Sequence, residues 1–266
     1  MLLVGGGKMG GALLAGWLKR GIVKAKHVTV VEPDAGTAKA IRRRHRVAVV
    51  ADPGGIAAKP GTVVFAVKPQ AMNAVAPAYA RFAGAGTVFL SIAAGKTIGY
   101  FQARLGPKAA IVRAMPNTPA AVGHGITVAI ANRRVGKAER KRCDRLLKAV
   151  GEVAWIDDEA LMDAVTAVSG SGPAYVFLLA ESLAEAGKAA GLPADLSGRL
   201  ARVTVAGSGE LLHRAADDPA TLRRNVTSPG GTTAAALELL MAADGLQPLL
   251  TRAVAAAAKR SKQLAS

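Results

Sequence analysis

Short apolar runs alternate with helical patterns over the first part of the chain. Between the first two runs, Met9, Leu13, Leu14, Trp17 and Leu18 recur at the spacing of one helix face. Continuous apolar strands that alternate with helices are typical of a parallel sheet with both faces covered. Strands are predicted over residues 2–4, 28–31, 47–50, 62–67, 87–92 and 110–114, with two further edge strands over 125–131 and 153–156, and helices over 35–44 and through Met72 and Tyr79.

The chain changes character after about residue 157, where strand signals stop and helical patterns follow one another. Pro173 stands in the first turn of a long helical segment and Gly191 follows its end, the usual asymmetry of helices. The run Gly207-Ser208-Gly209 is expected to interrupt the next helix. We therefore predict a sheet domain over residues 1–157 and an all-helical domain over residues 158–266, with helices over 173–190, 193–215, 219–226, 231–243 and 246–264.

The composition supplies ample apolar material for a core, since 51% of the 266 residues are hydrophobic and the mean hydropathy is +0.27. Aromatic residues make up only 4%, so the core is predicted to be aliphatic. The single cysteine, Cys143, excludes an internal disulfide and a cysteine-cluster metal site. It shares helical spacing with Leu146, Leu147 and Val150, which predicts a buried packing residue. A reducing, cytoplasmic location is expected.

The net charge of +17 raises the question of a nucleic-acid partner. The alternative is a basic solvated surface that attracts small anions. The charge is spread along the chain, and runs such as residues 42–46 and 140–142 are not interleaved with aromatic residues, so we favour the alternative. The apolar run 174–180 ends at Glu181, far short of about 20 residues, so no membrane span is expected.

The glycine run that follows the first predicted strand fits the pattern G-x-G-x-x-G over residues 5–10. It opens a helix and precedes a second strand that ends in an acid, Glu32, which is the context of a dinucleotide-binding Rossmann fold. A glycine-rich turn without a ligand is the alternative. Glu32 can bind a ribose 2′-hydroxyl and so favours NADH, whereas Lys39, Arg42 and Arg43 could offset its charge and admit the 2′-phosphate of NADPH. The choice between NADH and NADPH stays open.

A second glycine-rich segment, SPGGTT at residues 228–233, leads into the helix-forming sequence AAALELL. Ser and Thr are ordinary N-caps, which is one explanation of this segment. The other is an anion site, because free N–H groups at a helix start bind anions and glycine lets a ligand approach the backbone. The histidines (His27, His45, His124 and His213) form no catalytic constellation and no metal spacing, so we expect no metal.

Five stretches carry a resemblance to a known family: VKP at 67–69, SIAAG at 91–95, RAMPNTP at 113–119, VSGSGPAYVF at 168–177 and SPGGTT at 228–233. In this order, with the glycine motif, the chain closely resembles pyrroline-5-carboxylate reductase over essentially its whole length. That resemblance implies an NAD(P)H-dependent oxidoreductase that reduces 1-pyrroline-5-carboxylate to proline. It also implies a Rossmann domain followed by a helical dimerisation domain. The site would lie between one subunit's cofactor domain and the helical domain of a homodimer, and dimers of the family can assemble into rings.

The resemblance also suggests which residues bind the cofactor. The pyrophosphate loop corresponds to Gly5, Gly7, Lys8, Met9 and Gly10. The path from adenosine to nicotinamide is lined by Val67, Lys68 and Pro69 and by Ala93, Ala94 and Gly95, and the loop near the nicotinamide by Met115, Pro116 and Asn117.

For the substrate, the resemblance points to Gly231, Thr232 and Thr233 as the carboxylate site, with Asn225 beside it. Thr233 matches the threonine that hydrogen-bonds the ring nitrogen, so it is the candidate catalytic residue. If the imine arrives protonated, no strong side-chain acid is needed. The SGSGPAY segment either contacts a ligand or permits close packing at the dimer interface.

Two departures from the family pattern concern the cofactor site. The strand before Gly5 is shorter than usual, and Glu32 stands near a position where many relatives carry a small polar residue suited to a 2′-phosphate. The rival hypothesis is a β-hydroxyacid dehydrogenase, which shares the fingerprint and relies on a lysine of a helix in the second domain. Lys188, within AEAGKAAGL, is the candidate for that lysine.

Overall fold

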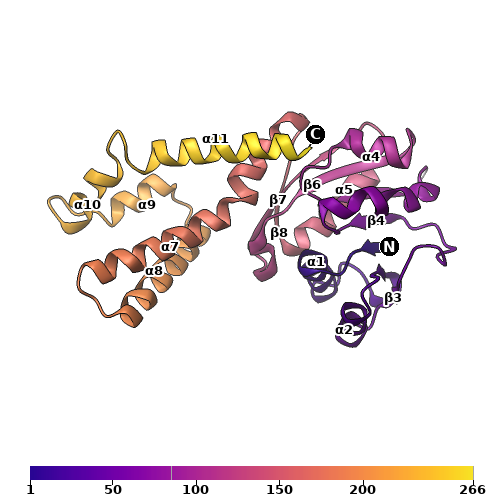
Figure 1. Ribbon diagram of the computed structural model, residues 1–266, viewed down its shortest axis with the longest axis horizontal. Coiled ribbons are helices and arrows are strands. Elements are labelled where there is room, and N and C mark those ends of the chain that lie inside the picture. The colour runs from indigo at the N-terminus through magenta and orange to yellow at the C-terminus, as the bar shows by residue number, and fades with distance from the viewer. Residues whose placement is uncertain (85, 266) are drawn as a thin grey trace. The chain divides into compact units, whose positions relative to one another are not determined.

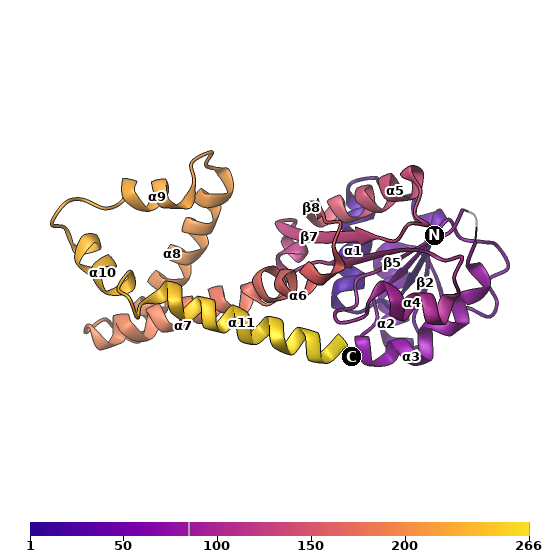
Figure 2. The ribbon, with the colours of Figure 1, turned by 90° about the horizontal axis from the view of Figure 1, so that it is seen from above.

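The computed structural model describes residues 1–84 and 86–265 and shows two compact units (Figures 1 and 2). The first unit comprises Met1–Gly170 and Ala257–Ser266, and the second comprises Ser171–Ala256. The segment after residue 157, up to Gly170, is grouped with the sheet although it is helical. The domain boundary between residues 157 and 158 stays a prediction.

The first unit is built on an eight-stranded sheet with the order β3-β2-β1-β4-β5-β6-β7-β8. Neighbouring strands are parallel except β6 and β7, which run antiparallel. The mainly parallel sheet is therefore confirmed, with one antiparallel pair, so that β7 and β8 run opposite to the other strands. The strands are β1 (Leu2–Val4), β2 (Thr29–Val31), β3 (Ala48–Val50), β4 (Thr62–Phe65), β5 (Val88–Ser91), β6 (Ala110–Met115), β7 (Gly125–Ala131) and β8 (Gly151–Trp155).

The strand order reverses between β1 and β4, and this reversal positions the site. The chain leaves β1 toward β2 on one side and leaves β4 toward β5 on the other side. The loops that follow these two strands consequently diverge and leave a crevice at the carboxyl edge of the sheet. Open α/β sheets bind their ligands in a crevice of this kind.

Both faces of the sheet are buried, as adjacent residues of β1 show. Leu3 packs into a cluster with residues of α1 (Lys8–Lys19), α2 (Ala35–His45) and α5 (Lys137–Leu147). Leu2 and Val4 pack on the other face, with α3 (Met72–Val75), the following 3₁₀ segment Ala76–Phe82 and α4 (Ile98–Leu105). Burial on both faces explains why the strands are continuous apolar runs.

The core is not purely aliphatic, contrary to the expectation from composition. Phe65 lies edge-on to Tyr79 and parallel to the rings of Phe89 and Phe101, with centroids 5.3 to 6.1 Å apart. These rings all belong to one face of the sheet. The few aromatic residues are therefore concentrated, a distribution that a percentage cannot reveal.

Three local predictions differ from the structure. The helix through Met72 and Tyr79 is divided into α3 and a 3₁₀ segment, because Pro77 lacks the N–H that would continue the helix. Helix α4 was not predicted, although Thr97 caps it by accepting a hydrogen bond from the Tyr100 N–H at 3.0 Å. The run Gly207–Gly209 does not interrupt a helix, since α8 is continuous across it.

The second unit is helical, as predicted. Helices α7 and α8 approach closely where Gly187 meets Ser197, whose hydroxyl donates to the Ala184 carbonyl at 2.6 Å. No helix in the described part of the chain is long and apolar enough to cross a membrane. The helices after β8 are α6 (Met162–Val165), α7 (Gly172–Ala189), α8 (Ala194–Arg214), α9 (Pro219–Asn225), α10 (Thr232–Leu240) and α11 (Leu246–Ala265), whose last turns belong to the first unit.

Candidate functional site

A pocket of about 660 Å³ lies in the first unit at the carboxyl edge of the sheet. The volume is of the size that a cofactor or other small molecule occupies. Of the residues predicted for the cofactor, it brings together Gly7, Lys8, Met9, Val67, Lys68, Pro69, Ala93, Ala94, Met115, Pro116 and Asn117. It is also lined by Ala66, Ile92, Thr118 and Gly170, which the sequence analysis did not assign.

The N-terminus of α1 opens at this pocket. Gly7 is the N-cap, and no side chain caps the helix. The first turn contains no acidic residue, so the N–H groups and the positive end of the helix dipole are available to an anion. The charged residues among those that line the pocket are Lys8 and Lys68, both positive. The pocket therefore suits a ligand that carries phosphate groups.

Gly5 and Gly10 do not line the pocket but shape the loop that borders it. Gly5 has φ +94°, a left-handed conformation, and a Cβ there would lie 2.8 Å from Cγ1 of Val67. A Cβ on Gly10 would lie 2.2 Å from the Gly5 carbonyl oxygen. These two glycines allow the tight turn and the close approach of α1 to the strands, which explains their spacing in the motif.

Glu32 follows β2, and its carboxylate is held by the backbone. Oε2 accepts a hydrogen bond from the Gly6 N–H at 2.8 Å, and Oε1 accepts one from the Asp34 N–H at 3.1 Å. Asp34 in turn caps α2, and hydrogen bonds from Thr37 lower the pKa of its carboxyl. Two carboxylates therefore stand at the turn between β2 and α2, beside the glycine loop.

The cations near this turn are not equally available to offset those charges. Arg42 donates from Nη2 to the Val49 carbonyl at 2.8 Å and is thereby held toward β3. Lys39 and Arg43 are exposed on α2. Of these three cations, Arg42 is therefore held by a hydrogen bond to the sheet.

The loops after β5 and β6 form the opposite wall of the pocket. The Ser91 hydroxyl accepts a hydrogen bond from the Ala93 N–H at 3.2 Å. The Asn117 side chain accepts one from the Ile126 N–H at 3.0 Å and so joins its loop to β7. A Cβ on Gly170 would lie 2.5 Å from Cε of Met115, so a side chain there would displace the end of the Met115 side chain. Gly170 belongs to the SGSGPAY segment, so one part of that segment does line the pocket.

The residues predicted for the substrate lie in the second unit. Gly231 is the N-cap of α10, and no side chain caps this helix. Its N–H donates to the Ser228 carbonyl at 3.0 Å, after a left-handed Gly230 with φ +69°. Among the described residues, the N–H groups of Thr232 and Thr233 have no side-chain cap and no backbone acceptor outside the helix. The explanation by an ordinary Ser or Thr cap is therefore wrong, and the helix start is open.

Thr233 and Asn225 are the two residues whose side chains are predicted to act on the substrate. Thr233 is half-buried, and Asn225 is exposed at the end of α9.

Lys188, the lysine of the rival hypothesis, lies near the end of α7 and forms an ion pair with Glu185 at 2.6 Å. Its side chain is 40% exposed. Cys143 is fully buried, as predicted, and burial raises the pKa of its thiol to about 12. Neither residue lines the pocket.

Family models match both parts of the chain. The model described as pyrroline-5-carboxylate reductase dimerisation matches residues 159–264. The model described as NADP oxidoreductase, coenzyme F420-dependent, matches residues 1–95. The first match includes α10 and its glycine-rich entry, and the second includes the glycine loop and the strands from β1 to β5.

Individual relatives match nearly the whole chain. A pyrroline-5-carboxylate reductase of Pseudomonas aeruginosa is 40% identical over 98% of this chain and 95% of its own length. One from Synechocystis is 39% identical over 98% of this chain and 97% of its own. The solved pyrroline-5-carboxylate reductase of Coxiella burnetii is 32% identical with a TM-score of 0.93, covering 100% of this chain and 98% of its own. The Plasmodium falciparum enzyme, solved with NADP bound, is 31% identical with a TM-score of 0.83, covering 100% and 97%.

Proposed function

The chain belongs to the pyrroline-5-carboxylate reductase family, and we propose that it reduces 1-pyrroline-5-carboxylate to L-proline with a hydride from NADH or NADPH, the last step of proline biosynthesis. The single observation that carries this function is the pocket at the strand-order reversal, which brings the cofactor residues of four separate segments together. We place the reaction in the cytoplasm, a reducing compartment that suits a chain with one buried thiol.

The residues of the pocket fit a nicotinamide dinucleotide. The open N-terminus of α1 holds the pyrophosphate, and Lys8 and Lys68 balance its charge. The backbone at Ala93 and Ala94 and the loop from Met115 border the nicotinamide end. When bound, the cofactor supplies the hydride, while the protein supplies position and field. We assign this role to the sheet domain, predicted over residues 1–157.

The substrate carboxylate is held by the start of α10, in the helical domain predicted over residues 158–266. The N–H groups available there are those of Thr232 and Thr233, because that of Gly231 donates to the Ser228 carbonyl, and Gly231 keeps a side chain away from the carboxylate. Charge-assisted hydrogen bonds contribute about 1.5–3 kcal/mol each. The Thr233 hydroxyl accepts a hydrogen bond from the protonated ring nitrogen, and Asn225 stands beside this group. Together they fix the orientation of the imine.

The proton of the product amine comes with the substrate. An imine that arrives protonated already carries the hydrogen that remains on nitrogen after reduction. The residues that line the pocket include no histidine and no carboxylate, which agrees with a mechanism that depends on positioning rather than on a side-chain acid.

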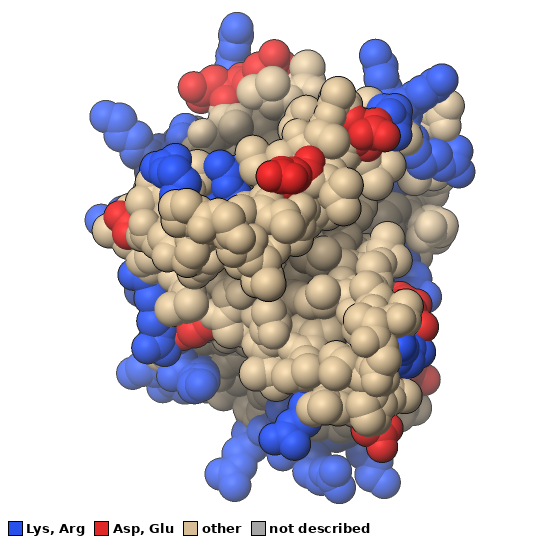
Figure 3. Space-filling view, turned by 90° about the vertical axis from the view of Figure 1, so that its left-hand side faces the viewer, with Lys and Arg blue, Asp and Glu red and all other residues tan. Residues whose placement is uncertain are grey.

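The helices of the second unit leave their apolar side chains exposed, and we propose that a homodimer buries them. Helix α7 contains no buried residue, and Phe177 and Leu178 are 67% and 60% exposed. Leu211 of α8 and Leu239 of α10 are 68% and 78% exposed. In one view of the molecule the centre is uncharged, and Lys and Arg, with fewer Asp and Glu, stand toward the margin (Figure 3). Several large apolar side chains exposed on one helical unit indicate an interaction surface. The family resemblance extends the proposal to a ring of dimers.

The test is the loss of nicotinamide absorbance with purified protein and racemic 1-pyrroline-5-carboxylate, with NADPH and NADH in separate assays. Turnover with either cofactor would support the proposed reaction. No turnover with either, in protein shown to be folded and dimeric, would contradict it.

A further inference from the structure

Arg113 is a buried cation that none of the proposed steps uses. It lies on β6, only 5% exposed, two residues before Met115 at the pocket wall. A buried charge is costly unless it is paired and hydrogen-bonded. The residue that pairs with Arg113 therefore indicates the role of this buried charge.

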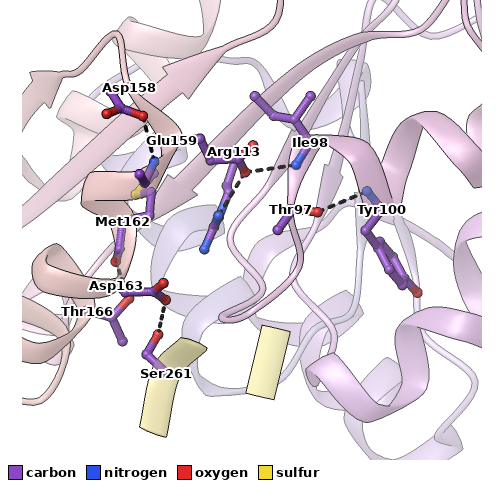
Figure 4. A network of polar contacts seen from close by, with 11 residues as sticks. Thr97, Ile98, Tyr100, Arg113, Asp158, Glu159, Met162, Asp163, Thr166 and Ser261 are labelled. Atoms are coloured by element: carbon purple, nitrogen blue, oxygen red, sulfur yellow. Dashed lines mark hydrogen bonds and ion pairs between the residues drawn. The ribbon is translucent and has the colours of Figure 1, made fainter. Parts of the chain in front are cut away.

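The partner is Glu159, from the 3₁₀ turn Glu159–Leu161 that follows the sheet (Figure 4). Its Oε1 lies 2.8 Å from Nη1 of Arg113 and accepts a second hydrogen bond from the Ile98 N–H at 2.9 Å. Ile98 is the first residue of α4, so the carboxylate also lies at the positive end of that helix. Asp158 caps the 3₁₀ turn by accepting from the Ala160 N–H at 2.9 Å, which fixes the segment that carries Glu159.

Oε1 of Glu159 thereby links the two loops that are proposed to border the nicotinamide, one from Ala93 and one from Met115. The loop from Ala93 ends at Ile98, which Glu159 holds. The loop from Met115 begins just after Arg113, which Glu159 also holds. The other end of the first loop is set by the pairing of Ser91 with Arg113 across β5 and β6. The spacing between the two loops consequently depends on the pair.

We propose that Arg113 and Glu159 are positioning residues, which hold the Ala93–Ala94 backbone and the Met115–Asn117 loop at the separation that the nicotinamide end of the cofactor requires. The proposal rests on the proposed function in one respect, the binding of a nicotinamide dinucleotide in this pocket. In the described part of the chain, the hydrogen bonds of Glu32, at the adenosine end, come from Gly6 and Asp34 and none of them from the Arg113–Glu159 pair. Loosening the pair should therefore affect the two halves of the cofactor unequally.

The experiment compares the full-length protein with Glu159→Gln, using calorimetric titration of NADH and of ADP-ribose, which lacks the nicotinamide. We expect the dissociation constant of NADH to rise about tenfold, which corresponds to about 1.4 kcal/mol, and that of ADP-ribose to stay unchanged. In turnover assays kcat should fall as well, because the nicotinamide is held less accurately. Glu159→Asp keeps the charge and should recover part of the NADH affinity.

The matched control is Asp144→Asn, which removes another carboxylate of the first unit. Asp144 pairs with Lys148 at 2.9 Å and accepts from the Trp155 ring at 3.1 Å, away from the pocket. The Asp144→Asn variant should leave both dissociation constants unchanged.

Equal losses of NADH and ADP-ribose affinity in Glu159→Gln would show a merely structural role and overturn the inference. Unchanged NADH affinity would also overturn the inference. If Glu159→Gln does not fold, the same comparison is made with Glu159→Asp. A wild-type protein that bound neither ligand would remove the proposed function itself.

Discussion

The carboxylate of Glu32 accepts a hydrogen bond from the backbone N–H of Gly6, with 2.8 Å between Oε2 and the nitrogen. Glu32, which follows β2, therefore holds the glycine loop through a direct hydrogen bond. Its second oxygen is held by the Asp34 N–H, so the charge stays at the turn where the adenosine ribose of a dinucleotide lies. Arg42, which could have offset it, is directed to the Val49 carbonyl. The choice between NADH and NADPH therefore depends on whether this negative charge or the exposed cations of α2 dominate.

Replacing Glu32 by Ser should shift cofactor preference toward NADPH. Removing a like charge from the position of a 2′-phosphate is worth about 1–2 kcal/mol, so we expect the ratio of kcat/KM for NADPH to that for NADH to rise about tenfold. KM for both cofactors should rise too, because Gly6 loses its acceptor. Asp34→Ser is the control, since Ser preserves the cap of α2 and leaves Glu32 in place. A wild-type protein that prefers NADPH would mean that the exposed cations of α2 dominate.

The hydroxyl of Thr233 should be worth about 1.5–3 kcal/mol, the range for a hydrogen bond to a charged group, so Thr233→Ala should lower kcat/KM for 1-pyrroline-5-carboxylate about 10- to 100-fold. Thr233→Ser should retain most of the activity. Thr232→Ala keeps the backbone N–H and loses only a neighbouring exposed side chain, so its kcat/KM should stay close to wild type. Steady-state kinetics of the three variants measure kcat/KM. A Thr233→Ala variant with the kcat/KM of the wild type would refute the role of this hydroxyl.

Lys188→Ala should retain activity on 1-pyrroline-5-carboxylate. The lysine is partly exposed, its partner is Glu185, and it lies outside the pocket. An exposed ion pair of this kind contributes little to stability, about 0–1 kcal/mol. The assay is the same absorbance measurement, with Glu185→Gln as the matched variant. Loss of activity in Lys188→Ala alone would favour the β-hydroxyacid dehydrogenase chemistry.

Phe177→Glu should convert the dimer to a monomer. Burying a phenylalanine side chain contributes about 1.5–3 kcal/mol, and a carboxylate in an apolar interface carries a further desolvation cost. Light scattering coupled to size exclusion measures the mass directly. Phe177→Leu preserves an apolar side chain and should remain dimeric. A wild-type protein that is already monomeric at assay concentration would contradict the proposed interface.

The buried thiol of Cys143 should make stability fall as the pH rises above about 9. In the unfolded chain the thiol ionises near its ordinary pKa of 9.0, whereas in the folded protein the pKa is about 12. Between these values the native state keeps a proton that the unfolded state releases, so unfolding becomes more favourable with increasing pH. Urea denaturation at pH 8 and pH 10 tests this, with Cys143→Ala as the control. The change with pH should be smaller in Cys143→Ala, and an equal change in both proteins would exclude the thiol as its source.

Local patterns were sufficient for the sheet and for the motifs. Every residue of the central strands β1, β4 and β5 is buried, so these strands are almost continuous apolar runs that can be recognised without their neighbours. The glycine motif is equally local, because its positions serve one turn and one helix start. Helix α4 escaped prediction because it is short and contains Gly99, and only its cap and the pair Phe101 and Leu105 signal it.

The sequence by itself determined the fold class, the order of most elements and the segments that line the pocket. Only the tertiary structure decided how those segments meet. Glu32 reaches back to Gly6, and Arg113 meets Glu159 from 46 residues away. Such pairs depend on strand order and on the direction of each side chain, which follow from packing of the whole unit. A pattern of neighbouring residues carries information about its own helix or strand, whereas a contact between distant residues exists only once the chain has folded.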